Sequence, residues 1–173
     1  MNVVNQQERR ISRRKYLFYY MAGFVEGDGC FSVSIKKYKQ MKFGWVVDPM
    51  FSVYQHKSNK IMLELFQKEL HCGYIVKKKG KSDVLVYVVD NRRTLEEKIL
   101  PFFRKHVLLG KKWNDFLIFE KIVLMMKDKK HLQRQGLKEI VKLAFKMNQQ
   151  GKGRKYSEKE ILEDLSESPE TIR

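Results

Sequence analysis

Two acidic residues, Glu26 and Asp28, close a short glycine-rich segment that spans residues 21–29 and has the sequence MAGFVEGDG. The apolar residues before them follow helical spacing, and Gly27 and Gly29 are typical of a helix end. Asp28 is therefore expected at the negative, C-terminal end of a helix dipole, which disfavours a carboxylate. A hard cation with oxygen ligands, such as Mg²⁺, would remove this penalty. Short Gly/Asp stretches are common in turns, so spacing alone favours an ordinary helix-to-strand turn with solvated acids over a metal site, and both stay open.

Gly23 and Gly27 are four residues apart, one turn along the same stripe of this predicted helix. Because glycine has no side chain, a second backbone could approach the helix closely along that stripe. The segment is too short for an EF-hand loop and lacks the ligand spacing of one. The sequence thus predicts a small-residue helix face that ends beside a carboxylate.

The hydrophobic period along the chain predicts elements in the order αββαββα, followed by extra helices. Strand 30–36 alternates between an apolar and a polar face, and strand 46–55 is its partner, in which Pro49 indicates an edge position or a bulge. This order predicts one α+β domain. The other predicted elements are the first helix over 15–25, a helix capped by Ser58, a hairpin with strands 73–78 and 84–90, a helix that starts at Asn91 and is kinked or ended by Pro101, and helices 111–126 and 137–145.

Three parts are expected along the chain. Residues 1–14 form a basic N-terminal arm, and residues 15–150 form the folded domain. Residues 151–173 form a linker followed by an acidic C-terminal tail, which is either a short helix or frayed.

The chain has 36 Lys and Arg against 20 Asp and Glu, a net charge of +16, with 43% apolar residues. A folded surface this basic favours polyanions, nucleic acid before anionic membrane, whereas a merely soluble lysine-rich surface would carry more balancing acids. The longest apolar stretch, nine residues over 17–25, is too short to span a bilayer. Cys30 and Cys72 make neither a disulfide framework nor a zinc motif. We therefore expect an intracellular protein, either in a bacterial cytoplasm or in an organelle, with no membrane partner.

The nine residues MAGFVEGDG resemble the signature of the LAGLIDADG homing endonucleases, with conservative changes at most positions. The similarity extends to the strand over 30–36, to VYQ at 53–55, to LPFF at 100–103 and to LLGKKWNDF at 108–116. The chain has one copy of the signature and no internal repeat, so the resemblance implies a homodimer in which two signature helices pack together. The implied interface residues are Met21, Ala22, Gly23, Val25 and Gly27.

The resemblance also implies how the active site is built. Two copies of Asp28 would meet at the centre of a saddle of strands, and both would stay ionised only with cations between them. Asp28, with the carbonyl of Gly27 as a second ligand, would bind Mg²⁺ or another divalent cation. Gln55 would orient water, and Lys111 or Lys112 would counter the charge at the scissile phosphate.

Strand alternation predicts which side chains would face DNA. A strand of about nine residues spans about 30 Å, so each half of a dimer could cover about nine base pairs of a long, near-palindromic duplex. Loop lysines are expected to bind phosphates, and alternating strand residues to read bases. The expected DNA-binding residues are Ser32, Ser34, Lys36, Tyr38, Asp48, Met50, Ser52, Tyr54, Lys77, Lys78, Lys79, Lys81, Leu85 and Tyr87.

The sequence favours a site-specific, metal-dependent DNA endonuclease, because Asp28 is retained within the signature. Two alternatives of the same fold stay open: a maturase that binds its host intron RNA, and a DNA-binding protein that no longer cleaves. A basic structural RNA-binding protein would fit the charge but would leave the signature unexplained.

Overall fold

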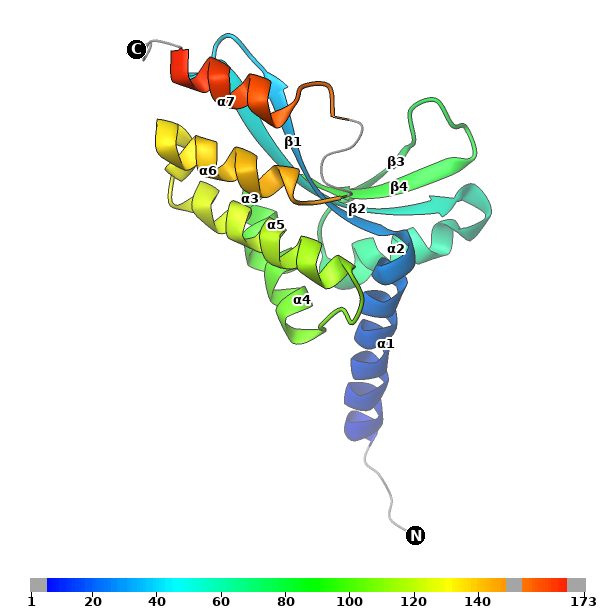
Figure 1. The fold of residues 1–173 in the computed structure, drawn as a ribbon. Coiled ribbons are helices and arrows are strands. Elements are labelled where there is room, and N and C mark those ends of the chain that lie inside the picture. The colour runs from blue at the N-terminus through cyan, green and yellow to red at the C-terminus, as the bar shows by residue number, and fades with distance from the viewer. Residues whose placement is uncertain (1–5, 149–153, 168–173) are drawn as a thin grey trace.

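A computed structural model of the protein describes residues 6–148 and 154–167, with side chains from residue 13 onward. A four-stranded antiparallel sheet forms its centre, with its strands in the order β1-β2-β4-β3 (Figure 1). The strands are β1 Gly29–Lys37, β2 Trp45–His56, β3 Tyr74–Lys77 and β4 Val84–Val89. The α-helices are α1 Gln6–Asp28, α2 Lys60–Leu70, α3 Arg92–Thr94, α4 Leu100–Lys105, α5 Lys112–Lys127, α6 Arg134–Phe145 and α7 Glu158–Glu167.

The α+β class and the αββαββα order are confirmed, and α5, α6 and α7 are the extra helices. Short 3₁₀ turns, η1 at Lys57–Asn59 and η3 at Lys130–Leu132, precede α2 and α6, and a π-helical turn, η2 at Leu95–Ile99, joins α3 to α4. Within residues 6–148 and 154–167, no helix has the length and hydrophobicity that crossing a membrane requires.

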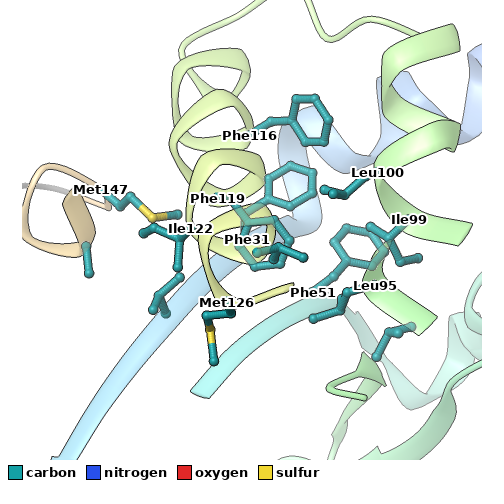
Figure 2. Close-up of a cluster of buried hydrophobic side chains, with 14 of the residues drawn as sticks. Phe31, Phe51, Leu95, Ile99, Leu100, Phe116, Phe119, Ile122, Met126 and Met147 are labelled. Carbon is teal, nitrogen blue, oxygen red and sulfur yellow. The ribbon is translucent and has the colours of Figure 1, made fainter. Parts of the chain in front are cut away.

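One face of the sheet carries an aromatic core, which is shown in Figure 2. Phe31 of β1 stacks on Phe51 of β2 with 5.2 Å between ring centroids, and its edges meet Phe103 at 5.0 Å and Phe116 at 5.4 Å. All four side chains are fully buried. Because each buried aromatic stabilises the fold by about 1.5–3 kcal/mol, this cluster holds α4 and α5 firmly against the same face of the sheet.

The opposite face of the sheet, here called the outer face, follows from the strand register. Ser32 pairs with Met50 across β1 and β2, and Tyr54 pairs with Val86 across β2 and β4. Because side chains alternate along a strand, these residues point away from Phe31 and the core. The outer-face positions are Cys30, Ser32, Ser34, Lys36, Val46, Asp48, Met50, Ser52, Tyr54, Tyr74, Val76, Val86 and Val88.

The prediction that Leu85 and Tyr87 face outward is wrong. Tyr87 pairs with Val53 of the core face and is fully buried, and its hydroxyl donates to the carbonyl of Cys72 at 3.0 Å. Burial, together with Cys72, raises the pKa of Tyr87 well above its ordinary value. Strand β4 is apolar at every position, VLVYVV, so its sequence does not reveal which residues face the core.

Pro49 lies in β2, which is an inner strand of the sheet. The pairing of β2 with β4 begins at Phe51, whereas Pro49 pairs with Val33 of β1. The missing N–H of proline therefore falls where β2 has β1 as its strand neighbour and no β4 partner, which agrees with the predicted edge position.

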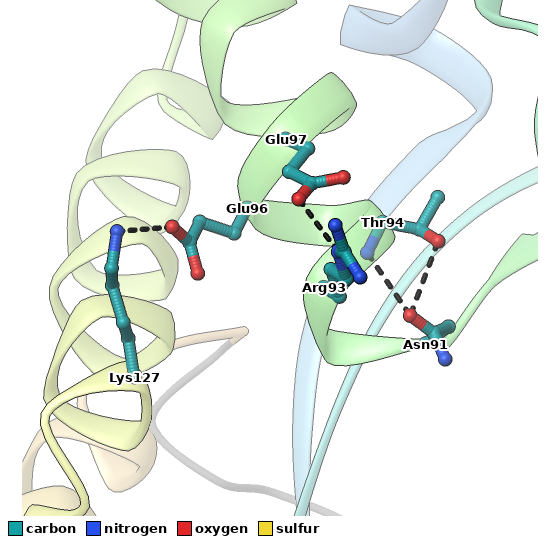
Figure 3. Close-up of polar contacts among 6 residues, drawn as sticks. All are labelled: Asn91, Arg93, Thr94, Glu96, Glu97 and Lys127. Atoms are coloured by element: carbon teal, nitrogen blue, oxygen red, sulfur yellow. Dashed lines mark hydrogen bonds and ion pairs between the residues drawn. The ribbon is translucent and has the colours of Figure 1, made fainter.

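A continuous helical stretch runs from Arg92 to Lys105 through α3, η2 and α4. It begins as predicted at Asn91, whose side chain accepts a hydrogen bond from the Thr94 amide at 3.0 Å. Figure 3 shows this cap together with the Arg93–Glu97 pair and the link from Lys127 of α5 to Glu96. Pro101 does not end the helix. It follows the π-helical turn, in which the Leu100 amide bonds to the carbonyl of Leu95, and it lies in the first turn of α4, where a missing N–H donor is tolerated.

Helix α1 begins at Gln6, so the prediction of a basic arm over residues 1–14 is wrong from Gln6 onward. Residues 1–5 lie outside the described residues. The helix is 23 residues long, which is about 34 Å at ~1.5 Å per residue. In Figure 1 its N-terminal half extends away from the sheet, and its C-terminal end meets the start of β1.

Strand β1 is one of the two edge strands of the sheet, and side chains from the C-terminal region bind its backbone carbonyls. Asn148 donates to the carbonyl of Phe31 at 2.7 Å, and Arg154 donates to the carbonyl of Val33 at 2.7 Å. Arg154 also reaches the carbonyl of Ala144 at 2.8 Å. These bonds satisfy edge carbonyls that would otherwise be free to pair with another strand.

The predicted domain end at residue 150 is also wrong, because α7 completes the core. Ile161 and Leu165 are buried, and Asp164 accepts a hydrogen bond from the Trp45 indole at 2.7 Å. The chain end predicted as either a helix or a frayed tail is thus a packed helix over Glu158–Glu167. Part of the predicted linker, residues 151–153, lies outside the described residues, as do residues 168–173.

Truncation of α7 at its buried face should lower the stability of the whole protein. Leu165→Ala removes a fully buried side chain and is expected to lower the free energy of unfolding by about 2–4 kcal/mol. Lys159→Ala, on the exposed side of the same helix with its side chain 84% exposed, is the control and should change it by under about 0.5 kcal/mol. Urea denaturation measures both, and equal values for the two variants would contradict the docking of α7.

Candidate active site

The junction between α1 and β1 has no intervening residue, because the helix ends at Asp28 and the strand begins at Gly29. A Cβ at Gly29 would overlap the side chain of Val25 and would lie 2.8 Å from its carbonyl oxygen. Val25 is fully buried and cannot move aside. Glycine is therefore required for the strand to leave the helix this closely, and the exposed carboxylate of Asp28 is held at the start of the sheet.

Asp28 and Gln55, far apart in sequence, lie in contact. The Nε2 of Gln55, at the end of β2, donates to Oδ2 of Asp28 at 2.7 Å, and its Oε1 accepts from Nδ2 of Asn59 at 3.0 Å. A hydrogen bond to an ionised carboxylate is stronger than one between neutral groups. The sequence prediction named Asp28 and Gln55 but missed Asn59, which lies four residues after Gln55.

Two lysines were predicted near this carboxylate, and they differ in position. Lys112, half-buried at the start of α5, donates from Nζ to the carbonyl oxygen of Gly29. Lys111 precedes the helix and is exposed to solvent. The ammonium group of Lys112 therefore lies at the α1–β1 junction, one residue beyond Asp28.

Glu26 ties a second loop to the end of α1. Its Oε1 accepts a hydrogen bond from the backbone N–H of Gly110 at 2.8 Å. A Cβ at Gly110 would lie 2.8 Å from Oε2 of Glu26, so glycine lets the loop approach this closely. The loop leads directly into α5, and this bond consequently fixes where Lys112 begins the helix.

The oxygen atoms at the α1–β1 junction are of the kind that bind a hard cation, but there are too few of them in one chain to complete its coordination. Asp28 offers carboxylate oxygens, and Gly27 lies in the last helical turn, whose carbonyls have no intrahelical partner. Oxygen ligands of this kind suit Mg²⁺, which keeps several waters. Within the described part of the chain, no three His, Cys, Asp or Glu side chains gather closely enough to hold a metal ion. The described residues of one chain therefore do not form a complete set of metal ligands.

The outer face holds most of the strand residues predicted to face DNA. Ser32, Ser34 and Lys36 of β1 and Asp48, Met50 and Tyr54 of β2 all lie on it with at least partial exposure. Tyr38 is exposed just beyond β1, and Lys78, Lys79 and Lys81 are exposed at the β3–β4 turn. Lys77, the last residue of β3, is also exposed, but it pairs with Leu85 and so lies on the core side of the strand. The prediction that Ser52 contacts DNA is wrong. Ser52 occupies an outer-face position but is fully buried, so it cannot meet a ligand directly.

Charged and aromatic groups on this side of the sheet are paired with one another. Lys36 forms an ion pair with Asp48 across β1 and β2. The Nζ of Lys78 lies 4.8 Å from the centroid of the Tyr54 ring. Tyr74, which the sequence prediction missed together with Val76, donates to Asp90 at 2.6 Å, and this bond is the main reason that its pKa is raised.

Comparison with known proteins assigns the family. The sequence profile described as LAGLIDADG endonuclease matches residues 21–123. The chain belongs to this family. The match begins in the signature helix and includes Asp28, Gln55 and both lysines.

The individual relatives agree with this assignment. The chain is 42% identical over 89 residues to the DNA endonuclease I-CeuI of Chlamydomonas moewusii, covering 51% of this chain and 41% of that protein. It is 29% identical to the homing endonuclease I-ApeII of Aeropyrum pernix over 83% of this chain and 86% of the relative. Among solved structures, the archaeal intron-encoded homing endonuclease I-Vdi141I in complex with DNA superposes with a TM-score of 0.81 at 34% identity, covering 88% and 96% of the two chains. The matched part of the chain thus spans less than half the length of I-CeuI and most of the length of the other two.

The signature helix of this LAGLIDADG protein has two distinct sides. Met21, Ala22 and Val25, which were predicted to contact a partner helix, are instead buried in the core of their own chain. Gly23 and Gly27 are exposed, and a Cβ at either would meet nothing within 4 Å. The exposed stripe continues toward the N-terminus through large aromatic side chains missed by the sequence prediction, namely Tyr16, Tyr19 and Tyr20.

The close approach at the junction can be tested by adding one methyl group. Gly29→Ala forces a Cβ into Val25 and should lower the free energy of unfolding by about 1–3 kcal/mol. Lys68→Ala, at an exposed position of α2, is the control and should change the free energy of unfolding by under about 0.5 kcal/mol. Chemical denaturation of both variants at one protein concentration is the measurement. Full stability of Gly29→Ala would show that the α1–β1 junction tolerates a side chain.

Proposed function

We propose that this chain is a homing endonuclease that hydrolyses phosphodiester bonds in a long, near-palindromic DNA duplex. The observation that carries the proposal is the hydrogen bond from Gln55 to Asp28 at 2.7 Å, at the end of the signature helix. Carboxylate, amide donor and the nearby ammonium of Lys112 are groups that phosphodiester hydrolysis can use. The similar structure of I-Vdi141I in complex with DNA supports DNA as the substrate.

The active form is proposed to be a homodimer. One chain contributes one exposed carboxylate at the junction, and the exposed stripe beginning at Tyr16 and ending at Gly27 offers a face for a second copy. A two-fold axis along that stripe would bring Asp28 beside the partner's Asp28. The pair of carboxylates would then repel each other, which favours cations between them.

DNA is proposed to lie along the outer face. Strand β1 has nine residues, about 30 Å at ~3.3 Å each, so one sheet matches about nine base steps of ~3.4 Å. Ser32, Ser34 and Met50 would meet base edges in the major groove, while the lysines of the β3–β4 turn would meet phosphates. Lys36 and Asp48 offer a donor beside an acceptor on the same surface.

A divalent cation held by Asp28 and the carbonyl of Gly27 would polarise the phosphoryl oxygen and lower the pKa of bound water. Gln55 donates directly to Asp28, so its amide is suited to orienting a water that approaches the carboxylate. Lys112, at the carbonyl of Gly29, is suited to countering negative charge that develops on the phosphate. Glu26 acts through its bond to Gly110, which sets the start of α5.

Asp28→Asn tests the proposal directly. The amide keeps the shape of the side chain but cannot carry the charge that a cation requires. Cleavage should fall at least about a thousandfold, because a bound metal contributes several kcal/mol to the transition state. Binding to duplex DNA should stay within about threefold, since the outer face is untouched. Single-turnover cleavage and filter binding are measured on the duplex that the wild-type chain selects from a randomised library.

Unchanged cleavage by Asp28→Asn would remove this carboxylate from the mechanism. Sedimentation of a stable monomer on the full-length duplex would overturn the homodimer.

The two neighbouring lysines provide a matched pair. Lys112→Met should reduce the cleavage rate about a hundredfold, the usual loss when a group that stabilises transition-state charge is removed. Lys111→Met, with its side chain exposed before α5, should stay within about threefold. Cleavage time courses at saturating Mg²⁺ measure both. The reverse ranking would assign the role to Lys111.

A further inference from the structure

Asn59 occupies the residue before α2, where a short polar side chain ordinarily accepts a hydrogen bond from the helix amides. Here its side chain makes no such capping bond. Its Nδ2 donates instead to Oε1 of Gln55 at 3.0 Å. A residue type suited to stabilising the helix is therefore engaged with the candidate active site.

We infer that Asn59 is a positioning residue, which holds the amide of Gln55 so that its donor end faces Asp28. The inference rests on the proposed function, because it concerns the role of Gln55 in the same site. Asn59 itself contacts Gln55 and acts through it.

The segment that carries Asn59 is well anchored. Before α2, the His56 side chain accepts from the Ser58 amide at 3.3 Å, and the Lys57 amide donates to the Asp83 carbonyl at 2.8 Å. After the turn, the buried residues Leu63 and Phe66 fix α2 under the sheet. Asn59 therefore presents its amide from a fixed backbone, as a positioning group must.

The amide of glutamine has one acceptor oxygen and one donor nitrogen, so occupying one end determines where the other points. With Oε1 engaged by Asn59, Nε2 is directed to Oδ2 of Asp28. The reversed amide would set its carbonyl oxygen against the Asp28 carboxylate, which costs a charge-assisted hydrogen bond and adds repulsion. If Asp28 held a cation, its carboxylate would share its charge with the ion and would bind Gln55 less strongly, and Asn59 would be the contact that keeps the amide facing the site.

A purely structural role for Asn59 makes a different prediction from a positioning role. If Asn59 served the helix, its replacement would lower the stability of the protein and affect activity only as a consequence. If it serves Gln55, a residue that is an equally good helix cap but too short to reach Oε1 should spare stability and reduce activity. Serine meets both conditions and adds no charge near DNA.

The experiment compares Asn59→Ser, Gln55→Ala and the double variant in the full-length chain. On the wild-type-selected duplex with Mg²⁺, Asn59→Ser should slow single-turnover cleavage about fivefold, the worth of one hydrogen bond, with an unchanged Tm and unchanged DNA affinity. In the Gln55→Ala background the same change should have no further effect, because the group it positions is gone. An equal fivefold loss in both backgrounds, a lowered Tm, or wild-type cleavage by Asn59→Ser would overturn the inference.

A second measurement separates this inference from the proposed function. In the free protein, the side-chain NH₂ signals of Gln55 in ¹⁵N spectra report its hydrogen bonds without any DNA or metal. Asn59→Ser should shift these signals and speed their exchange with water, and unchanged signals would overturn the inference. A wild-type chain that binds but never cuts duplex would instead overturn the proposed function, while the Gln55 signals would still decide whether Asn59 orients the amide.

Discussion

The close approach of the Gly29 backbone to Val25 is the constraint on which the rest of the site depends. It removes any linker between α1 and β1, so the carboxylate that ends the helix lies at the first residue of the sheet. Other contacts then converge on the same point. Gln55 comes from the end of β2, Lys112 reaches the carbonyl of Gly29, and Glu26 holds the loop before α5. A longer junction would let Asp28 move relative to all of these groups.

The same sheet separates two environments, and this separation explains where the charge lies. The core face is filled by Phe31, Phe51 and the helices beneath them, so charged groups are excluded from it. Among the outer-face positions of the strands, Asp48 is the acidic residue, and it forms an ion pair with Lys36. The acid-rich helix α7 packs at the end of the sheet, where Asp164 is engaged by Trp45 and Lys37. The net charge of +16 is therefore compatible with an outer face on which negative charge is paired.

Sequence reasoning predicts elements well where the hydrophobic period is clear and fails where it is not. Strand β1 alternates strictly, and its outer residues were predicted correctly, whereas β4 is apolar on both faces and Tyr87 was placed on the wrong one. The start of α1 was missed because its first residues are polar and lack an apolar stripe. The packing of α7 depends on contacts with α6 and on the hydrogen bond with Trp45, which lies far away in the sequence. Asn59 gave no signal, since a polar residue before a helix is typical of a cap.

Helix α1 carries both the candidate active-site residue Asp28 and the proposed dimer interface, so the geometry of one depends on the geometry of the other. Its period of 3.6 residues places Met21, Ala22 and Val25 inward and Gly23 and Gly27 outward on the same two turns. The inward residues fix the helix on the core, and thereby fix the distance of Asp28 from Gln55. The outward glycines let a second helix approach to about 8 Å, the short end of helix packing distances. In the proposed homodimer, the separation of the two carboxylates would follow from these two packings together. A change in core volume on one side of α1 would therefore be transmitted to Asp28 and to the proposed cation site through the helix itself.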